Sequence, residues 1–271
     1  MPRVVVVGGG WAGCSAALAA ARAGAEVSVL ERTDCLLGTG LVGGIMRNNG
    51  RFTAAEEAIA LGGGELFQLC DEAARHRDVQ FPGHRHATLY DVARIEPMVR
   101  RKLLEAGVEI LFQTRATEVD MAGRRITAVR AKDELAGRYL TMPADAFVDA
   151  TGTAGPQGNC SKYGNGCAMC ILRCPTFGGR VSIAAKAGVK ELVGGTAAGT
   201  TGSMSGSCKL LKESLAPEIV SRLNEAGVVV VPIPEEMRKK DQLAKKACQQ
   251  YALPEFAENL ILLDTGHAKL M

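Results

Sequence analysis

The first thirty-one residues contain the pattern that most limits the fold. Branched aliphatic residues fill positions 4–7 without polar alternation, which is typical of a central strand in a parallel sheet. A glycine-rich turn, Gly8-Gly9-Gly10-Trp11-Ala12-Gly13, follows this strand and precedes an alanine-rich segment that predicts a helix over 14–23. A second strand over 26–30 runs into Glu31. This order predicts a β-α-β unit that binds a dinucleotide.

Each glycine of the turn has a physical role in this interpretation. Gly8 permits the tight turn, Gly10 lets the backbone approach a pyrophosphate, and Gly13 lets the helix pack closely on the strand. Amide groups at the start of the helix would bind the phosphates, and Glu31 would accept a hydrogen bond from a ribose hydroxyl. The cofactor residues predicted in the turn are Gly8, Gly10, Trp11, Ala12 and Gly13.

Two further features carry a family resemblance. Residues 33–51 are rich in glycine and asparagine and show little periodicity, whereas a nicotinamide domain usually continues into further short β-α units. A hydrophobic strand over 146–149 then ends in Ala150-Thr151-Gly152. With these markers the sequence resembles the glutathione-reductase-like FAD superfamily. The resemblance implies FAD contacts at Arg32, Gly38, Thr39 and Gly40, an adenine contact at Ala116, and pyrophosphate contacts at Ala150, Thr151 and Gly152.

Within that superfamily the sequence is most similar to tRNA-uridine-modifying flavoproteins and to heterodisulfide-reductase-like flavin subunits. In the former a cysteine-proline pair follows the Ala-Thr-Gly region, and Cys174-Pro175 is its counterpart here. The implied fold is α/β, with a Rossmann-like FAD-binding domain and an inserted α+β substrate domain. We expect the FAD-binding domain over 1–158, with an irregular insertion over 33–90, and the cysteine cluster with a substrate or partner domain over 159–271.

Four cysteines gather in the segment that follows, at Cys160, Cys167, Cys170 and Cys174. The last three, followed by proline, match the C-x2-C-x3-C-P part of bacterial ferredoxin sequences, and the spacing is not that of a zinc ribbon. We therefore predict that all four bind an iron–sulfur cluster, which would place a one-electron centre beside the flavin. Three alternatives remain: a redox-active dithiol of Cys167 and Cys170, a lone nucleophile at Cys174, or buried thiols without chemistry. In the catalytic alternatives the reacting residues are Cys170 and Cys174.

Other candidate residues lie outside this cluster. Cys208 could replace Cys160 as a ligand, and Cys35 is expected near the flavin edge. His84 and His86 are expected in a loop, either as an acid–base or substrate-binding pair or as two exposed histidines. The remaining elements predicted by periodicity and turn residues are helices over 56–75 (with a break at 62–64), 91–106, 181–187, 209–226 and 235–251, and strands over 108–113, 126–132, 138–142, 228–231 and 259–263.

Composition and charge exclude several classes of protein. The 271 residues are 47% hydrophobic and 23% charged, which argues against disorder, and the net charge of +3 makes a nucleic-acid partner unlikely for this chain. No apolar run reaches the roughly 18 residues of a membrane span, and the N-terminus lacks a signal peptide, so we expect a cytoplasmic location without membrane contact. Nine cysteines, an odd number, do not suggest a disulfide framework.

The resemblance also implies a partner. In the superfamily the chain returns to the first domain with a strand and a Gly-Asp segment that binds the ribityl chain, and no such segment precedes Met271. We expect a second subunit, in a heterodimer or larger hetero-oligomer, to complete the FAD pocket. The predicted function is an FAD-binding oxidoreductase subunit that passes electrons between a small organic substrate or NAD(P)H and the iron–sulfur centre. The alternatives are a flavin-dependent RNA-modifying enzyme with Cys174 as nucleophile, and a non-catalytic nucleotide-binding scaffold.

Overall fold

The computed structural model describes residues 1–152, 174–191, 196, 198–200, 208–246 and 252–271. The described residues form two compact units that are interleaved along the chain. The first unit holds residues 1–41, 96–152 and 174–191, and the second holds residues 42–95 and the described residues from 196 onward. No helix within these residues combines the length and the apolar character that crossing a bilayer requires.

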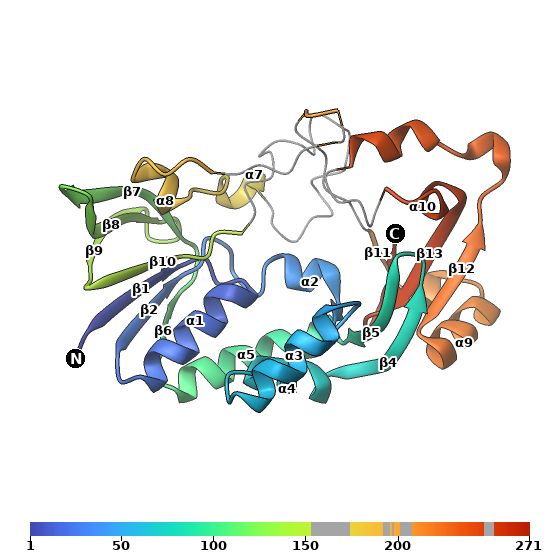
Figure 1. Cartoon of the computed structure of the whole chain (residues 1–271), viewed down its shortest axis with the longest axis horizontal. Coiled ribbons are helices and arrows are strands. Elements are labelled where there is room, and N and C mark those ends of the chain that lie inside the picture. The colour runs from blue at the N-terminus through green and yellow to red at the C-terminus, as the bar shows by residue number, and fades with distance from the viewer. Residues whose placement is uncertain (153–173, 192–195, 197, 201–207, 247–251) are drawn as a thin grey trace. The chain divides into compact units, whose positions relative to one another are not determined.

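The first unit is built on a four-stranded parallel sheet (Figure 1). Its strands are β1 (Arg3–Val7), β2 (Glu26–Leu30), β6 (Glu109–Leu111) and β10 (Ala146–Asp149), and helix α1 (Trp11–Arg22) connects β1 to β2. The order across the sheet is β10-β1-β2-β6, so β1 lies between β10 and β2. The predicted β-α-β unit and its Rossmann-like parallel sheet are confirmed, with the helix beginning at Trp11 rather than at residue 14.

An antiparallel three-stranded sheet completes the core of the first unit. It consists of β7 (Thr114–Ala122), β8 (Arg125–Asp133) and β9 (Arg138–Pro143), which pair in chain order. The strands predicted over 126–132 and 138–142 are confirmed as β8 and β9, which pair with each other, whereas β7 was not predicted. Side chains from both sheets and from helix α8 (Ile183–Lys186) share one hydrophobic cluster: Val5, Val7, Leu30, Ala116, Val129, Ala131 and Ile183. The remaining described helices of this unit are α7 (Cys174–Phe177) and part of α5 (Val92–Glu105).

The second unit is a separate α+β structure with two antiparallel sheets. The first sheet has the order β3-β5-β4 and contains β3 (Ile45–Met46), β4 (Ala74–Phe81) and β5 (His84–Tyr90). The second has the order β11-β14-β13-β12 and contains β11 (Cys208–Leu210), β12 (Val228–Pro232), β13 (Asn259–Asp264) and β14 (Ala268–Leu270). Its helices are α2 (Thr39–Gly43, at the boundary of the units), α3 (Arg51–Ala60), α4 (Glu65–Glu72), α9 (Pro217–Ala226) and α10 (Glu255–Glu258).

Several predicted helices of the second unit are wrong in extent. The helix expected over 56–75 is two helices, α3 and α4, broken at Gly62–Gly64 as anticipated, and it gives way to strand β4 at Ala74. The helix expected over 209–226 begins only at Pro217, because proline suits the first turn of a helix and strand β11 occupies the preceding residues. The helix expected over 235–251 is represented in the described residues by two short 3-10 segments, Glu235–Met237 and Lys240–Lys245.

The expected loop around the two histidines is also wrong. His84 and His86 belong to strand β5, and His84 is buried. The strand that ends the chain, β14, was not predicted at all; it pairs with both β11 and β13. Hydrophobic side chains of the two sheets meet in one cluster: Val79, Phe81, Ala87, Leu89, Ile261 and Leu263.

A buried carboxylate joins these two sheets. Asp264, at the end of β13, has no exposed surface and lies 2.8 Å from the Arg75 Nε, 2.9 Å from the His76 Nε2 and 2.8 Å from the Lys212 Nζ. Burial alone would raise the pKa of Asp264, but the hydrogen bonds from Lys212, His76 and Arg75 outweigh it, so the pKa is lowered below its ordinary value of 3.8. Arg75 also contacts Asp91, 3.3 Å away, just before α5.

We expect Asp264→Asn to lower the free energy of unfolding by about 3 kcal/mol, because the change leaves three donors around a buried position without their counter-charge. The pKa of Asp264 is lower in the folded state than in the unfolded state. Its stabilising contribution is therefore present above pH 3.8 and is lost as the pH falls through the folded-state pKa. Urea unfolding as a function of pH measures both effects. The exposed Asp241→Asn, which removes an ion pair with Lys245, is the control and should change stability by no more than about 0.5 kcal/mol. Equal effects of the two substitutions would contradict the role of Asp264.

Candidate functional site

In the turn between β1 and α1, close packing requires glycine at two of the three motif positions. Gly8 has φ +101°, and a Cβ there would lie 2.4 Å from the Ala150 carbonyl oxygen. A Cβ on Gly13 would lie 1.8 Å from the Gly8 carbonyl oxygen, so any side chain would force the helix away from the strand. A Cβ on Gly10 would meet no atom within 4 Å. The fold of the described residues therefore requires glycine at positions 8 and 13, and leaves open space at position 10.

Helix α1 begins at this open space. Gly10 is the N-cap residue, and no side chain caps the helix, whose backbone Cys14 N–H donates to the Gly10 carbonyl oxygen. The first amides of an α-helix lack partners within the helix and carry the positive end of its dipole. A phosphate in the open space beside Gly10 would satisfy them, so this end of α1 fits a diphosphate.

Glu31 connects the ends of the first two strands. Its Oε2 accepts a hydrogen bond from the Gly9 N–H at 2.8 Å, and its Oε1 accepts from the Thr33 N–H at 2.8 Å and the Thr33 Oγ1 at 2.9 Å. The side chain is buried, with 6% of its residue surface exposed. A carboxylate offers about four acceptor positions, so one remains on Oε2 for a ribose hydroxyl. Glu31 thus fits its predicted role and also holds the glycine turn.

The segment after Thr33 folds back onto the glycine turn. The Leu37 N–H donates to the Gly9 carbonyl oxygen at 2.7 Å, and Leu37 forms a parallel bridge with Gly10. A Cβ on Gly40 would lie 2.4 Å from the Trp11 Nε1, so this glycine allows close packing. The predicted contacts Gly38, Thr39 and Gly40 therefore lie beside the start of α1.

A second carboxylate, Asp149, organises the end of β10. One of its oxygens accepts from the N–H and the hydroxyl of Thr151, at 3.1 and 2.6 Å. The other accepts from the Ser182 hydroxyl at 2.5 Å and the Ala184 N–H at 3.0 Å at the start of α8. Burial acts to raise the pKa of Asp149, but the hydrogen bonds from Ser182 and Thr151 prevail and lower it. The Ala150 N–H donates to the Val7 carbonyl oxygen, which places Ala150 and Thr151 next to the glycine turn.

The comparison with family models shows the family of this chain. Residues 3–155, more than half of the chain, match the model of the FAD dependent oxidoreductase family. The chain belongs to this family. The glycine turn and the space beside Gly10 lie within the matched residues.

Solved structures give further similarities. The chain is 20% identical to the THI4 protein of Thermovibrio ammonificans, with a TM-score of 0.42, and the match covers 60% of this chain and 62% of that one. It is 20% identical to the myxobacterial chondrochloren halogenase CndH, with a TM-score of 0.39 and coverage of 56% and 38%. It is 16% identical to the FAD-complexed glycerol-3-phosphate dehydrogenase of Bacillus halodurans, with a TM-score of 0.40 and coverage of 60% and 36%. The match spans less than two thirds of each of these proteins.

Two residues predicted at the adenosine end of FAD have other contacts within the described residues. Arg32 donates from Nη1 to the Gly178 carbonyl oxygen at 2.7 Å. Ala116 is 3% exposed and packs in the hydrophobic cluster of the first unit. Its methyl group is therefore occupied by the core, so that only its backbone could meet the adenine.

The predicted cysteine cluster lies largely outside the described residues. Cys160, Cys167 and Cys170 belong to that part of the chain, and Cys174 begins helix α7. Among the residues that the structure describes, no group of three or more histidine, cysteine, aspartate or glutamate side chains has an arrangement that could hold a metal. Cys35 and Cys208 are half-buried cysteines.

Three of the described cysteines have thiol pKa values above the ordinary value, which makes them unreactive packing groups. Cys14 and Cys70 are buried, and burial raises the pKa of Cys14 to about 12 and also raises that of Cys70. Burial raises the pKa of Cys35 as well, against a hydrogen bond from Thr33. None of the three has the lowered pKa of an activated nucleophile.

Sequence reasoning missed four residues that shape the site. These residues stabilise the turns beside the glycine turn and are Thr33, Asp149, Ser182 and Arg180. Arg180 donates to the Thr151 carbonyl oxygen and pairs with Glu191. A signal was present for Asp149, because an acidic residue two positions before Thr151 can accept hydrogen bonds from the Thr151 N–H and hydroxyl. Ser182 and Arg180 lie about thirty residues further along the chain, and no local pattern connects them to Asp149.

The contrast between the glycines gives a direct test. We expect Gly10→Ala to leave the free energy of unfolding of the apoprotein within about 1 kcal/mol of wild type, because its Cβ meets nothing. The same change should weaken FAD binding by about tenfold or more, equal to ~1.4 kcal/mol, since the Cβ fills the space next to the diphosphate. The matched variant Gly13→Ala should instead destabilise the apoprotein by about 3 kcal/mol through overpacking. Urea unfolding and FAD fluorescence titration measure the two quantities. Wild-type FAD affinity in Gly10→Ala would exclude a diphosphate at this turn.

A second test concerns Glu31. In Glu31→Gln one carboxylate oxygen becomes an NH2 group, so either the Gly9 N–H or the donors of Thr33 lose their acceptor. We expect a loss of about 1–3 kcal/mol in unfolding free energy and weaker FAD binding. Thermal unfolding with and without FAD separates the two losses. Glu26→Gln, at the exposed start of the same strand, is the control, and a Glu31→Gln protein as stable as this control would refute the described hydrogen bonds.

Proposed function

We propose that this chain is the FAD-binding subunit of an oxidoreductase that passes electrons between a small organic substrate or NAD(P)H and a cysteine-ligated iron–sulfur centre. One observation carries the FAD part of the proposal. In a turn where the other two motif glycines are fixed by packing, Gly10 faces open space at the uncapped start of a helix. A glycine that the fold itself does not need is best explained by a ligand that approaches its backbone.

The residues of the first unit would divide the binding of FAD among themselves. The amides at the start of α1 would bind the diphosphate, and Glu31 would accept a hydrogen bond from a ribose hydroxyl. Asp149 would keep Thr151 beside the glycine turn, as it does through its hydrogen bonds to the Thr151 N–H and hydroxyl. When bound, FAD supplies a group that exchanges either two electrons or single electrons with other reactants.

The iron–sulfur part of the proposal rests on the sequence. Cys167, Cys170 and Cys174 have the C-x2-C-x3-C-P spacing of ferredoxin ligands, and Cys160 is available as a fourth thiolate. Thiolates at this spacing can surround a cluster, and a cluster accepts one electron at a time. The segment would then connect the two-electron chemistry of the flavin to a one-electron acceptor or donor.

A second subunit is part of the same proposal. Within the described residues β10 pairs only with β1, so its outer edge is the edge of the parallel sheet. Unpaired strand edges are usually covered or paired in native proteins. We propose that a strand of a partner subunit lies at this edge and completes the FAD pocket.

The proposal is tested by purifying the protein anaerobically, adding FAD, and recording the visible spectrum together with iron and acid-labile sulfide. We expect flavin bands with a broad additional shoulder, and iron and sulfide in stoichiometric amounts. Cys167→Ser should abolish the shoulder and the iron while keeping the flavin bands. Cys70→Ala, which changes a buried thiol of helix α4 in the second unit, is the control and should keep all three signals.

The two parts of the proposal fail in different ways. Flavin without iron and sulfide would overturn the electron-transfer centre and leave the FAD subunit. A well-folded protein that takes up no FAD would overturn the whole function. Recovery of a stoichiometric, flavin-replete monomer would exclude the partner.

A further inference from the structure

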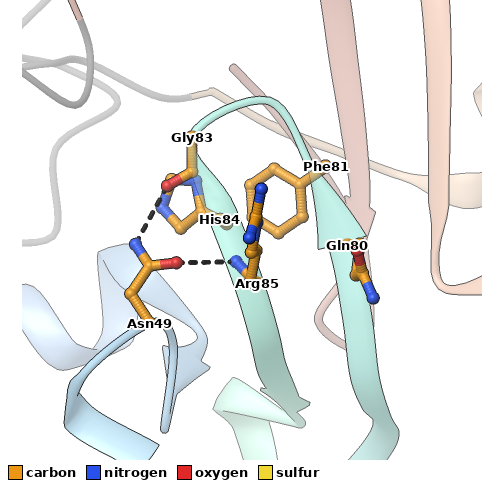
Figure 2. Close-up of a pocket in the computed structure, with 6 residues that line it drawn as sticks. All are labelled: Asn49, Gln80, Phe81, Gly83, His84 and Arg85. Atoms are coloured by element: carbon orange, nitrogen blue, oxygen red, sulfur yellow. Dashed lines mark hydrogen bonds between the residues drawn. The ribbon is translucent and has the colours of Figure 1, made fainter.

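A pocket opens at the end of the β4–β5 hairpin in the second unit (Figure 2). Its volume is about 510 Å³. The aromatic rings of Phe81 and His84 are buried, whereas Gln80, Arg85 and Asn49 are exposed. The full lining is Asn49, Gln80, Phe81, Gly83, His84 and Arg85. The pocket therefore combines buried rings with polar groups that remain accessible to a ligand.

The charge of this lining is positive. Arg85 contributes a guanidinium, and none of the six lining residues is acidic. In the described part of the chain no carboxylate lies within ion-pairing distance of Arg85, and no hydrogen bond involves the Gln80 side chain. Arg47 and Arg75 of the same unit are, by contrast, each paired with carboxylates. A guanidinium is the group that recognises carboxylates and phosphates in pairs of parallel hydrogen bonds.

Further positive charges act on the buried ring of the pocket. His84 is 3% exposed, stacks on Phe81 with ring centroids 4.2 Å apart, and its Nδ1 lies 3.0 Å from the Pro82 carbonyl oxygen. Burial lowers the pKa of His84, and the charges of Lys269 and Arg51 lower it further. Lys269 is itself buried, with its pKa lowered to about 8 by burial and by Lys209. The surroundings of the pocket thus disfavour an added positive charge and favour a negative one.

The hairpin end is held in place by Asn49. Its backbone N–H donates to the Arg85 carbonyl oxygen at 2.7 Å, its Oδ1 accepts from the Arg85 N–H at 2.8 Å, and its Nδ2 donates to the Gly83 carbonyl oxygen at 3.0 Å. Figure 2 shows the last two bonds as dashed lines from the Asn49 side chain. Asn49 has φ +55°, a conformation that asparagine tolerates better than most residues. The backbone that carries Arg85 is therefore fixed before any ligand binds.

A β-bulge sets the direction of Arg85. Phe81 pairs with His84 and Val79 with Ala87, so that two residues of β5, Arg85 and His86, lie opposite Gln80 alone. Bulges of this kind redirect side chains and are frequent beside binding and active sites. In Figure 2 the Arg85 side chain extends toward the turn of the hairpin.

From these observations we infer that the pocket binds the oxyanion group, carboxylate or phosphate, of a small molecule, with Arg85 as its charged donor and Gln80 as a neutral donor. Insofar as that molecule is the substrate of the oxidoreductase, the inference rests on the proposed function. As a binding site in the second unit it is independent of FAD. The substrate class is then a small organic acid or a phosphorylated small molecule.

The test is a titration of the full-length, FAD-treated protein at constant ionic strength with sodium succinate and, separately, with inorganic phosphate. The ring resonances of the histidines are followed by NMR. We expect saturable shifts of the His84 resonances with at least one of the two anions and a rise of the His84 pKa in the bound state, because the anion compensates the positive surroundings. Arg85→Gln should weaken binding by about tenfold or more. Arg77→Gln, which alters an exposed arginine of the same hairpin outside the pocket, is the matched control and should bind as wild type.

Each outcome decides the proposal. Saturation by succinate alone identifies a carboxylate site, and saturation by phosphate alone a phosphate site. The absence of saturable shifts with both anions, or binding that Arg85→Gln leaves unchanged, overturns the inference. Arg85 is exposed, so the thermal unfolding of its variant should match that of wild type and show that the fold is intact. Arg85-dependent binding in a protein that takes up no FAD would keep this site and refute the proposed function.

Discussion

The buried carboxylate of Glu31 makes the hydrogen bonds on which the candidate FAD site depends. It accepts hydrogen bonds from the turn after β1, through the Gly9 N–H, and from the turn after β2, through Thr33. Parallel strands end at the same edge of a sheet without any connection between their turns, so an acceptor shared by both turns fixes their relative position. Asp149 does the same on the other side of β1 by holding Thr151 and the start of α8. The open space beside Gly10 is thus bounded by turns that two carboxylates keep in place.

The β-α-β unit with its glycine turn could be predicted from the sequence because the interactions that form it are local. A buried valine run, three glycines at fixed spacing and an acid at the end of the next strand lie within about thirty residues, and each has one main physical interpretation. The requirements at Gly8 and Gly13 follow from the backbone alone, and the structure agrees with both. Ser182 and Arg180 could not be inferred, because their partners Asp149 and Thr151 precede them by about thirty residues and no periodic pattern connects such positions.

In the second unit local pattern competed with distant contacts, and the distant contacts decided the structure. The segment around residue 75 continues a helical pattern in the sequence, yet it forms β4, where Arg75 and His76 contact Asp264, far along the chain. The three-residue strands β11 and β14 are too short to show alternation; they pair with each other, and β14 also pairs with β13. Pro82 and Gly83 predict a loop around His84, but in the structure their turn contains only two residues and joins two strands.

The basic side chains at the two ends of the β4–β5 hairpin differ in their ion pairing. At the base of β4 the side chains of Arg75 and His76 contact the buried carboxylate of Asp264, which also pairs with Lys212. At the other end of the hairpin Arg85 has no such partner among the described residues, and Lys269 and Arg51 add to the positive surroundings of His84. A fold that can place a carboxylate against Arg75 and Lys212 could place one against Arg85 by a single substitution. The absence of a counter-charge there, in a pocket whose backbone is held by Asn49, is therefore better explained by a negative ligand than by chance.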